Sequence, residues 1–420
     1  MVGNGIEAPS QRKKVCVIGA GMAGLASARE LRREGQDVMV LEQRGDVGGQ
    51  WLYDPRVDGT DPLGASEPVK VHSSLYASLR LISARETMGF TDFPFAPKPK
   101  DGRDSRRFPD FCDAFGLIEL VRLNTSAARV ALAPGPTPTR QWTVSSVDLG
   151  KCNGTEEEEE VFDAVVVANG HYSQPILPTI KGMQVWRGRQ MHSHSYRVPE
   201  QFRDEVVVVV GCGLSGMEIA MEVRGVAKEV HLVAKSMEEV TQGLAKVLAK
   251  HSISLHLQLH VERLCPDGRV VFGDGSSVLA DTVIYCTGYN YAFPFLDTEE
   301  RSLSTTTVFA PWFFEAQAKW VVHVLSGKRT LPPEEEMMRS VEQFYHARDI
   351  DGVPKKFTHG VSLFDITYKN EFGCKYCDFP GVEKWRQELL MSTLANMVDN
   401  LETFRDDYQD SDSIRKGVEE

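Results

Sequence analysis

The stretch Val15–Leu25 constrains the fold more than any other part of the chain. It begins with four apolar, mostly β-branched residues and continues directly into Gly-Ala-Gly-Met-Ala-Gly and a helical pattern. A Gly-x-Gly-x-x-Gly sequence between a buried strand and a helix is the fingerprint of a dinucleotide-binding unit. Its glycines permit a tight turn, the approach of a pyrophosphate and close helix packing. The predicted cofactor contacts here are Gly19, Ala20, Gly21, Met22, Ala23 and Gly24.

An acidic residue follows at the spacing that such a unit requires. Asp37–Leu41 has the apolar pattern of a second strand, and Glu42 follows it about 20 residues after the fingerprint begins. A carboxylate there can accept hydrogen bonds from ribose hydroxyls. The glycine-rich loop beyond it adds Gly49, Gln50 and Trp51 as predicted cofactor contacts, with a plain surface turn as the alternative.

The same pattern recurs in the middle of the chain. Val206–Val210 is an apolar strand, a second fingerprint follows it, and Glu229–Ala234 is the next strand. We expect the cation Lys235, with Ser236 beside it, to stand where the first unit carries Glu42, which favours a 2′-phosphate and hence NADP over NAD. The alternative is an ordinary surface lysine. The predicted contacts of this unit are Gly211, Cys212, Gly213, Leu214, Ser215, Gly216 and Lys235.

Composition narrows the possible partners. The formal net charge of −12 argues against a general nucleic-acid or anionic-membrane surface, and no run of about 20 apolar residues is present to span a bilayer. We expect a cytoplasmic protein whose eight cysteines are reduced. Cys374 and Cys377 form a lone Cys-x-x-Cys without a second pair, so we expect no metal site.

These patterns predict an α/β fold with two Rossmann-like dinucleotide-binding domains. Helices are expected at 312–326, 334–348 and 382–404, and a solvated hairpin tip at Glu156–Glu160.

A further motif lies between the two units. Trp186-Arg-Gly188-Arg-Gln-Met-His192-Ser-His-Ser-Tyr196 resembles the identifying pattern of the flavin-containing monooxygenase family, specifically its plant thioglucoside (glucosinolate) S-oxygenase-like branch. Cys286–Tyr289 is similar to the second linker of that family, and Phe314–Trp320 to its C-terminal helix. The resemblance extends from residue 14 to about residue 405 and gives His192 a structural role.

The resemblance implies an NADPH-dependent flavin monooxygenase, similar to N,N-dimethylaniline monooxygenases and S-oxygenases. It also implies that the NADP domain is inserted in the FAD domain, with 13–180 as the first part of the FAD-binding domain, 181–287 as the NADP-binding domain and 288–420 as the return to the FAD domain and the C-terminal helices. Such an enzyme uses FAD, NADP and O₂ to pass one oxygen atom to a soft nucleophile, a thioether sulfur or an amine nitrogen, through a C4a-hydroperoxyflavin. The resemblance identifies no catalytic side chain in this chain. The physiological substrate and the oligomeric state stay open.

The chain departs from the family pattern at three places. Ile82 stands where the family commonly has an asparagine, roughly three helical turns are missing between Pro109 and Phe111, and only Glu299–Trp312 replace a longer flavin-facing segment. These departures keep two alternatives open. One is an uncoupled NADPH oxidase or a reductase-like flavoprotein, for which Cys374 and Cys377 would have to reach the flavin; the other is an inactive truncated family member.

Overall fold

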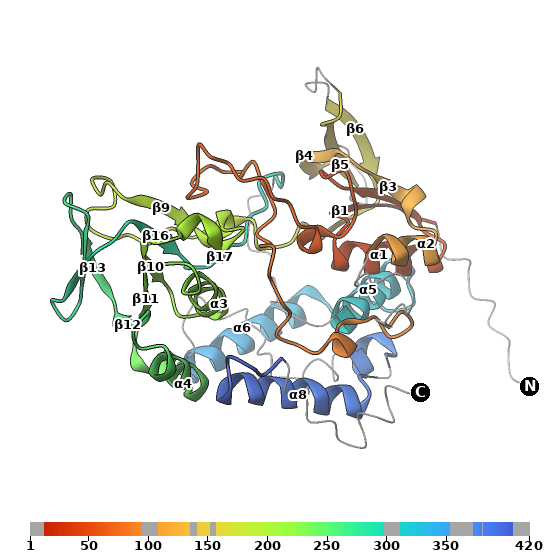
Figure 1. Ribbon diagram of the computed structural model, residues 1–420. Helices are drawn as coiled ribbons and strands as arrows, with labels where there is room; N and C mark the ends of the chain where they lie inside the picture. Colours follow the sequence, from red (N-terminus) through yellow and green to blue (C-terminus); the bar gives the residue numbers. More distant parts are fainter. Residues whose placement is uncertain are drawn as a thin grey trace, which may run out of the picture. The chain divides into compact units, whose positions relative to one another are not determined.

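The computed structural model describes residues 12–94, 108–134, 141–151, 157–297, 311–352, 373–379 and 381–405 (Figure 1). The chain forms two compact units, each assembled from separate stretches. The first comprises Met1–Gly49, Glu86–Asn169 and Phe293–Gln387, and the second comprises Gln50–Arg85, Gly170–Ala292 and Glu388–Glu420. The second unit therefore interrupts the first. The boundaries expected for the cofactor domains stay a prediction, because compactness alone identifies no cofactor.

The first unit is built on a parallel sheet with the strand order β3-β2-β1-β7. Its strands are β1 (Lys14–Ile18), β2 (Asp37–Leu41), β3 (Val121–Arg122) and β7 (Ala164–Val167), and α1 (Met22–Arg33) connects β1 to β2. The strand β1 pairs with β2 on one side and with β7 on the other. The carboxyl end of β1 is therefore a topological switch point, where open α/β sheets bind nucleotides.

An antiparallel sheet packs against this core. It consists of β4 (Thr125–Leu132), β5 (Trp142–Asp148) and β6 (Glu157–Phe162) in sequence order. The expected hairpin tip at Glu156–Glu160 is wrong for its described part, because Glu157–Glu160 belong to β6 and pair with β5. Glu160 forms ion pairs with Lys14 at 3.0 Å and Arg122 at 2.5 Å, which compensates the charge of the acidic strand.

The expected C-terminal helices are confirmed, although the third ends at Asp399 and not at residue 404. They are α5 (Pro311–Leu325), α6 (Glu334–Ile350) and α8 (Lys384–Asp399), and α2 (Phe108–Ala114) and the 3₁₀ turns η2 (Arg85–Met88) and η3 (Ile118–Leu120) precede them. Leu389 and Leu394 of α8 are buried as the helical spacing predicts. After α8 the chain continues through Leu401, which is buried in the core of the second unit.

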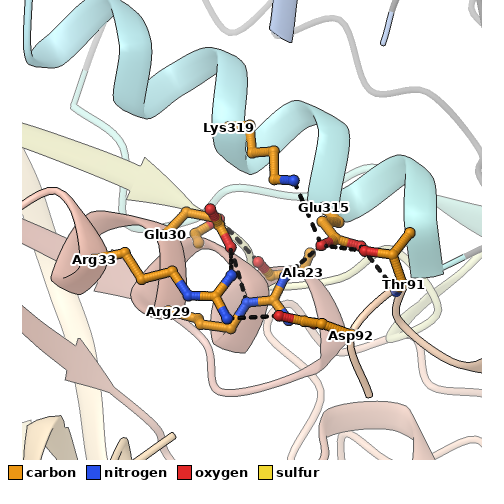
Figure 2. Close-up of polar contacts among 9 residues, drawn as sticks. Ala23, Arg29, Glu30, Arg33, Thr91, Asp92, Glu315 and Lys319 are labelled. Carbon is orange, nitrogen blue, oxygen red and sulfur yellow. Dashed lines mark hydrogen bonds and ion pairs between the residues drawn. The ribbon is translucent and has the colours of Figure 1, made fainter. Parts of the chain in front are cut away.

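A buried charge joins α1 to α5 within the first unit (Figure 2). The Arg29 guanidinium is 1% exposed, and it donates to Glu315 at 2.8 Å, to Glu30 at 2.9 Å and to Asp92 at 2.5 Å. The aromatic rings of Phe90, Phe111 and Phe115 also face it, with centroids 5.2–5.3 Å away. A buried cation without partners costs several kcal/mol, so Arg29 requires these carboxylates. The network therefore holds α1, the helix after the first fingerprint, against α5, almost 290 positions further along the chain.

The second unit repeats the parallel arrangement with the strand order β12-β11-β10-β16-β9 (Figure 1). Its elements are β9 (Arg189–His192), β10 (Val206–Val210), α3 (Leu214–Val223), β11 (Glu229–Ala234), α4 (Gln242–Lys250), β12 (Leu255–Leu259) and β16 (Thr282–Tyr285). Smaller elements are β8 (Gln174–Pro175), β13 (Val261–Leu264), β14 (Arg269–Phe272), β15 (Ser277–Leu279), β17 (Tyr289–Asn290), η4 (Ser193–Ser195), η5 (Pro199–Phe202) and η6 (Met237–Glu239). The strand β10 lies between β11 and β16, so its carboxyl end is again a switch point. The predicted fold class is confirmed.

Arg197 anchors an irregular segment to this second unit. Its guanidinium is 5% exposed and donates to the carbonyl oxygens of Asp54, Arg56, Ser73, His194 and Tyr196 at distances from 2.6 to 3.0 Å. A guanidinium has five N–H donors, so each can bond one carbonyl. This hub explains why residues 50–85 pack with the second unit although they follow the first fingerprint in the chain.

No helix within the described ranges is long and apolar enough to cross a membrane. Those ranges also contain no group of three or more His, Cys, Asp or Glu side chains arranged to hold a metal ion.

We expect Arg197→Lys to lower the free energy of unfolding of the second unit by about 2–5 kcal/mol. A lysine ammonium donates at most three hydrogen bonds, so buried carbonyls lose their partner. Urea denaturation followed by circular dichroism measures the effect. Arg263→Lys is the matched control, since Arg263 pairs with Glu262 on the surface of the same unit. An equal loss in both variants would contradict the proposed hub.

Candidate functional site

The first fingerprint forms a turn that only glycine can occupy at two of its positions. Gly19 has φ +104°, and a Cβ there would lie 2.5 Å from the carbonyl oxygen of Ala168 at the end of β7. A Cβ on Gly24 would lie 1.8 Å from the carbonyl oxygen of Gly19. The strand end and the helix are thus in direct backbone contact, which fixes where α1 begins.

The middle glycine faces the start of that helix. Gly21 is the N-cap of α1, no side chain caps this end, and the first turn holds no acidic residue. A Cβ on Gly21 would meet only Gly49, at 3.5 Å from its Cα. Ala20 and Met22 are buried, so what this loop offers to a ligand is its backbone. Free N–H groups and the positive end of the helix dipole fit a pyrophosphate.

Glu42 lies at the same edge of the sheet. It is 5% exposed, and its carboxylate accepts hydrogen bonds from the N–H of Ala20 at 2.8 Å and of Arg44 at 2.9 Å. Burial raises the pKa of Glu42, while these two hydrogen bonds and the Arg44 charge oppose the rise. Each carboxylate oxygen retains a lone pair for a ribose hydroxyl, so the residue fits its predicted role.

The loop at 49–51 forms the 3₁₀ turn η1 (Gly49–Trp51). Gly49 lies against Gly21 within the first unit, whereas Gln50 and Trp51 belong by their contacts to the second. The indole Nε1 of Trp51 is buried and has no hydrogen-bond partner among the described residues. An unpaired buried donor costs about 1–3 kcal/mol, which favours a ligand that supplies the acceptor.

The second fingerprint repeats the first closely. Gly211 has φ +116° and approaches the carbonyl oxygen of Cys286, while a Cβ on Gly216 would lie 1.8 Å from the Gly211 oxygen. Gly213 is the N-cap of α3, with no side-chain cap, no acidic residue in the first turn and open space around its missing Cβ. Cys212 is buried, Leu214 is half-buried and Ser215 is exposed. This edge also fits a pyrophosphate.

The strand register corrects the expected place of Lys235. Gly19 donates to the carbonyl of Leu41, and Gly211 donates in the same way to that of Val233. The counterpart of Glu42 is therefore Ala234, and Lys235 follows one residue later with an exposed side chain. Ala234 carries no negative charge that would repel a 2′-phosphate, so the predicted NADP preference keeps its rationale. The sequence spacing alone missed Ala234, because it cannot resolve a shift of one residue.

The motif Trp186–Tyr196 lies within the second unit, between the two fingerprints in the sequence, and its side chains are packed and hydrogen-bonded there. A Cβ on Gly188 would lie 2.2 Å from the ring of Trp186, which explains the aromatic-x-Gly spacing. His192 is fully buried, its Nδ1 accepts the N–H of His194, and burial lowers its pKa to about 3. The Tyr196 hydroxyl donates to Glu222 of α3 at 2.8 Å. A neutral imidazole in this packing supports a scaffold rather than catalysis.

The departures from the family pattern are only partly described. Ile82 packs against the apolar cluster of the second unit that contains Tyr196, Phe404 and Leu401. The chain from 298 to 310, and that from 95 to 107 before α2, lie outside the described residues. Of Cys374 and Cys377, the first is exposed and the second is buried, and burial raises the pKa of Cys377 to about 11.

Comparisons with known proteins agree with this geometry. A family described as flavin-binding monooxygenase-like matches residues 12–245. Two Arabidopsis thaliana proteins, flavin-containing monooxygenases FMO GS-OX-like 8 and 9, are 49% and 48% identical to this chain, cover 98% of it and are themselves covered to 95% and 96%. The alignments span 451 and 452 positions, more than the 420 residues of this chain, so each relative has positions without a counterpart here.

Two solved structures extend the likeness to three dimensions. The S-allyl-L-cysteine S-oxygenase of Allium sativum has a TM-score of 0.85 and 35% identity, with 97% of this chain and 98% of that chain covered. Tmm from Pelagibacter sp. strain HTCC7211 has a TM-score of 0.76 and 22% identity over 96% of this chain and 94% of that chain, which shows the shared fold.

We expect Gly21→Val to abolish flavin binding while the protein still folds. The backbone of Gly21 is extended and its surroundings tolerate a Cβ, but a branched side chain would fill the space that a pyrophosphate needs. Flavin absorbance per polypeptide and thermal unfolding measure the two effects separately. Gly24→Ala is the contrasting variant, expected to lose the fold because its Cβ has no room. Stoichiometric flavin in purified Gly21→Val protein would refute the assignment.

Proposed function

The chain belongs to the flavin-containing monooxygenase family, and from this we propose that it uses FAD and NADPH to transfer one oxygen atom from O₂ to a thioether sulfur or an amine nitrogen. Within that family it is a flavin monooxygenase. The observation that carries the proposal is that the same arrangement occurs in both units. At the carboxyl end of its central strand, each unit has a glycine turn followed by a helix N-terminus that no side chain caps. Two such edges suit two dinucleotides, as hydride transfer from NADPH to a flavin requires.

In this proposal, the first unit binds FAD and the second binds NADPH. The N-terminus of α1 would hold the pyrophosphate of FAD, and Glu42 would bind its ribose hydroxyls. The N-terminus of α3 would hold the pyrophosphate of NADPH, and Lys235 with Ser236 would bind its 2′-phosphate. When bound, the flavin supplies hydride acceptance and oxygen activation; the chain supplies binding, orientation and the exclusion of water.

Thioether sulfur is the favoured acceptor over amine nitrogen. The support comes from the Allium sativum protein, which is called an S-allyl-L-cysteine S-oxygenase and shares 35% identity over almost the entire chain. Thioether sulfur is a soft nucleophile that attacks an electrophilic oxygen without prior deprotonation. The proposal therefore requires no general base beside the acceptor.

We expect Lys235→Ala to weaken NADPH binding by about 1–3 kcal/mol and to leave NADH binding nearly unchanged, because only the 2′-phosphate loses a charge-assisted contact. Equilibrium titration of the oxidised protein with both coenzymes measures the difference. Lys228→Ala is the matched control, since Lys228 is exposed and lies in the turn before β11, at the opposite edge of the sheet. Equal losses for both coenzymes would refute the role of Lys235.

A second outcome of the same chemistry is an NADPH oxidase that releases hydrogen peroxide. Ile82, where the family commonly has an amide donor, favours it, because fewer donors would then hold NADP⁺ in place and water would have easier access. We expect much of the NADPH consumed to appear as hydrogen peroxide rather than as sulfoxide of a methyl thioether. Parallel assays of NADPH, peroxide and sulfoxide measure the ratio.

The variant Ile82→Asn should shift part of this consumption toward sulfoxide. Because Ile82 packs in an apolar cluster, Ile82→Ala is needed as a control that removes the packing without adding an amide. A gain in coupling with asparagine alone identifies the amide as its cause. Tight coupling in the unmodified protein would contradict the expectation.

A further inference from the structure

A carboxylate also lies at the carboxyl end of β11 in the second unit, but it comes from the turn that follows this strand. The short turn η6 (Met237–Glu239) follows β11 directly, and it places the Glu239 carboxylate 2.9 Å from the N–H of Lys235, which donates to it. Lys235 is the residue that follows the counterpart of Glu42. An acidic group therefore lies at the end of β11 although the strand itself ends in Ala234.

The corresponding strand end of the first unit also has a carboxylate, that of Glu42. There Glu42 accepts one N–H from the fingerprint loop, at Ala20, and one from the residues after β2, at Arg44. Glu239 likewise accepts an N–H just after β11, at Lys235. Each carboxylate thus accepts an N–H from the residues that directly follow the second strand of its unit. Burial first and the Glu239 charge second raise the pKa of Cys212, the counterpart of Ala20, to about 11.

The two carboxylates differ in how firmly they are held. Glu42 is buried and accepts two backbone N–H groups, whereas Glu239 is exposed and accepts one. An exposed hydrogen bond of this kind contributes little stability, so the side chain of Glu239 can move aside for a ligand. A ribose with a free 2′-hydroxyl can donate to it, but a 2′-phosphate must displace it.

We propose that Glu239 is a specificity-determining residue that accepts the ribose 2′-hydroxyl of NADH and opposes the 2′-phosphate of NADPH. The inference rests on the proposed binding of the coenzyme to the second unit. Lys235 and Glu239 then act in opposite directions on one subsite, and the chain uses both coenzymes with a modest preference for NADPH.

The test measures ligand binding without nicotinamide chemistry. Adenosine 2′,5′-bisphosphate and adenosine 5′-monophosphate are titrated calorimetrically into the purified, flavin-loaded protein. In Glu239→Gln, loss of the repelling charge should tighten the bisphosphate by about 5- to 20-fold, and loss of the charged acceptor should weaken the monophosphate by about 2- to 5-fold. Opposite changes in one variant cannot come from partial unfolding.

Glu238→Gln is the matched control. Glu238 is the neighbouring exposed acid of η6, and it forms no hydrogen bond or ion pair with the residues that the structure describes. Both affinities should change less than about twofold in this variant, since a fully solvated charge is screened. Equal tightening of the bisphosphate in both variants would show a general charge effect and refute a specific role for Glu239.

The outcomes also separate this inference from the proposed function. If the unmodified protein binds neither adenosine nucleotide, the assignment of the coenzyme to the second unit fails. If it binds the bisphosphate, and Lys235→Ala weakens that binding while Glu239→Gln leaves both affinities unchanged, the assignment holds and only the role of Glu239 is refuted.

Discussion

Both candidate nucleotide-binding edges depend on one close backbone contact, in which the third glycine of the fingerprint packs on the carbonyl of the first. A Cβ at Gly24 or Gly216 would lie 1.8 Å from that oxygen, so no other residue fits without moving helix or strand. The contact sets where α1 and α3 begin. It thereby points their free N–H groups at the switch point and places the end of the next strand beside them.

The fingerprints and the fold class could be predicted because their signals are local. Strand, glycine turn and helix follow one another within about 20 residues, and each has its own pattern. The role of Arg197 could not be predicted, since its partners are backbone carbonyls of Asp54, Ser73 and other positions that any sequence would offer. The prediction of a hairpin tip at Glu156–Glu160 was wrong for a related reason. The strand that Glu157–Glu160 form depends on pairing with β5 and on cations distant in the sequence, such as Lys14.

In the candidate site, too, the sequence could not predict features that depend on the three-dimensional structure. Spacing predicted that a residue near 235 would replace Glu42, but only the pairing of β10 with β11 shows that Ala234 is its counterpart. A shift of one residue along a strand moves a side chain from one face of the sheet to the other, and so changes what it can contact at the strand end. Glu239 was missed altogether, because a carboxylate that returns through a 3₁₀ turn leaves no spacing signal in the chain.

The contrast between the two edges follows from how each carboxylate is held. In the first unit the acid is part of the strand end, is buried and is fixed by two N–H groups, which suits a cofactor that stays bound through every turnover. In the second, Gly213 and Lys235 are exposed and the acid is held by one N–H. Under the proposed function, such an edge would release its ligand with little loss of internal bonding, as a coenzyme that is replaced in each cycle requires. We therefore expect the burial of this carboxylate to decide whether an edge of this fold retains or exchanges its ligand.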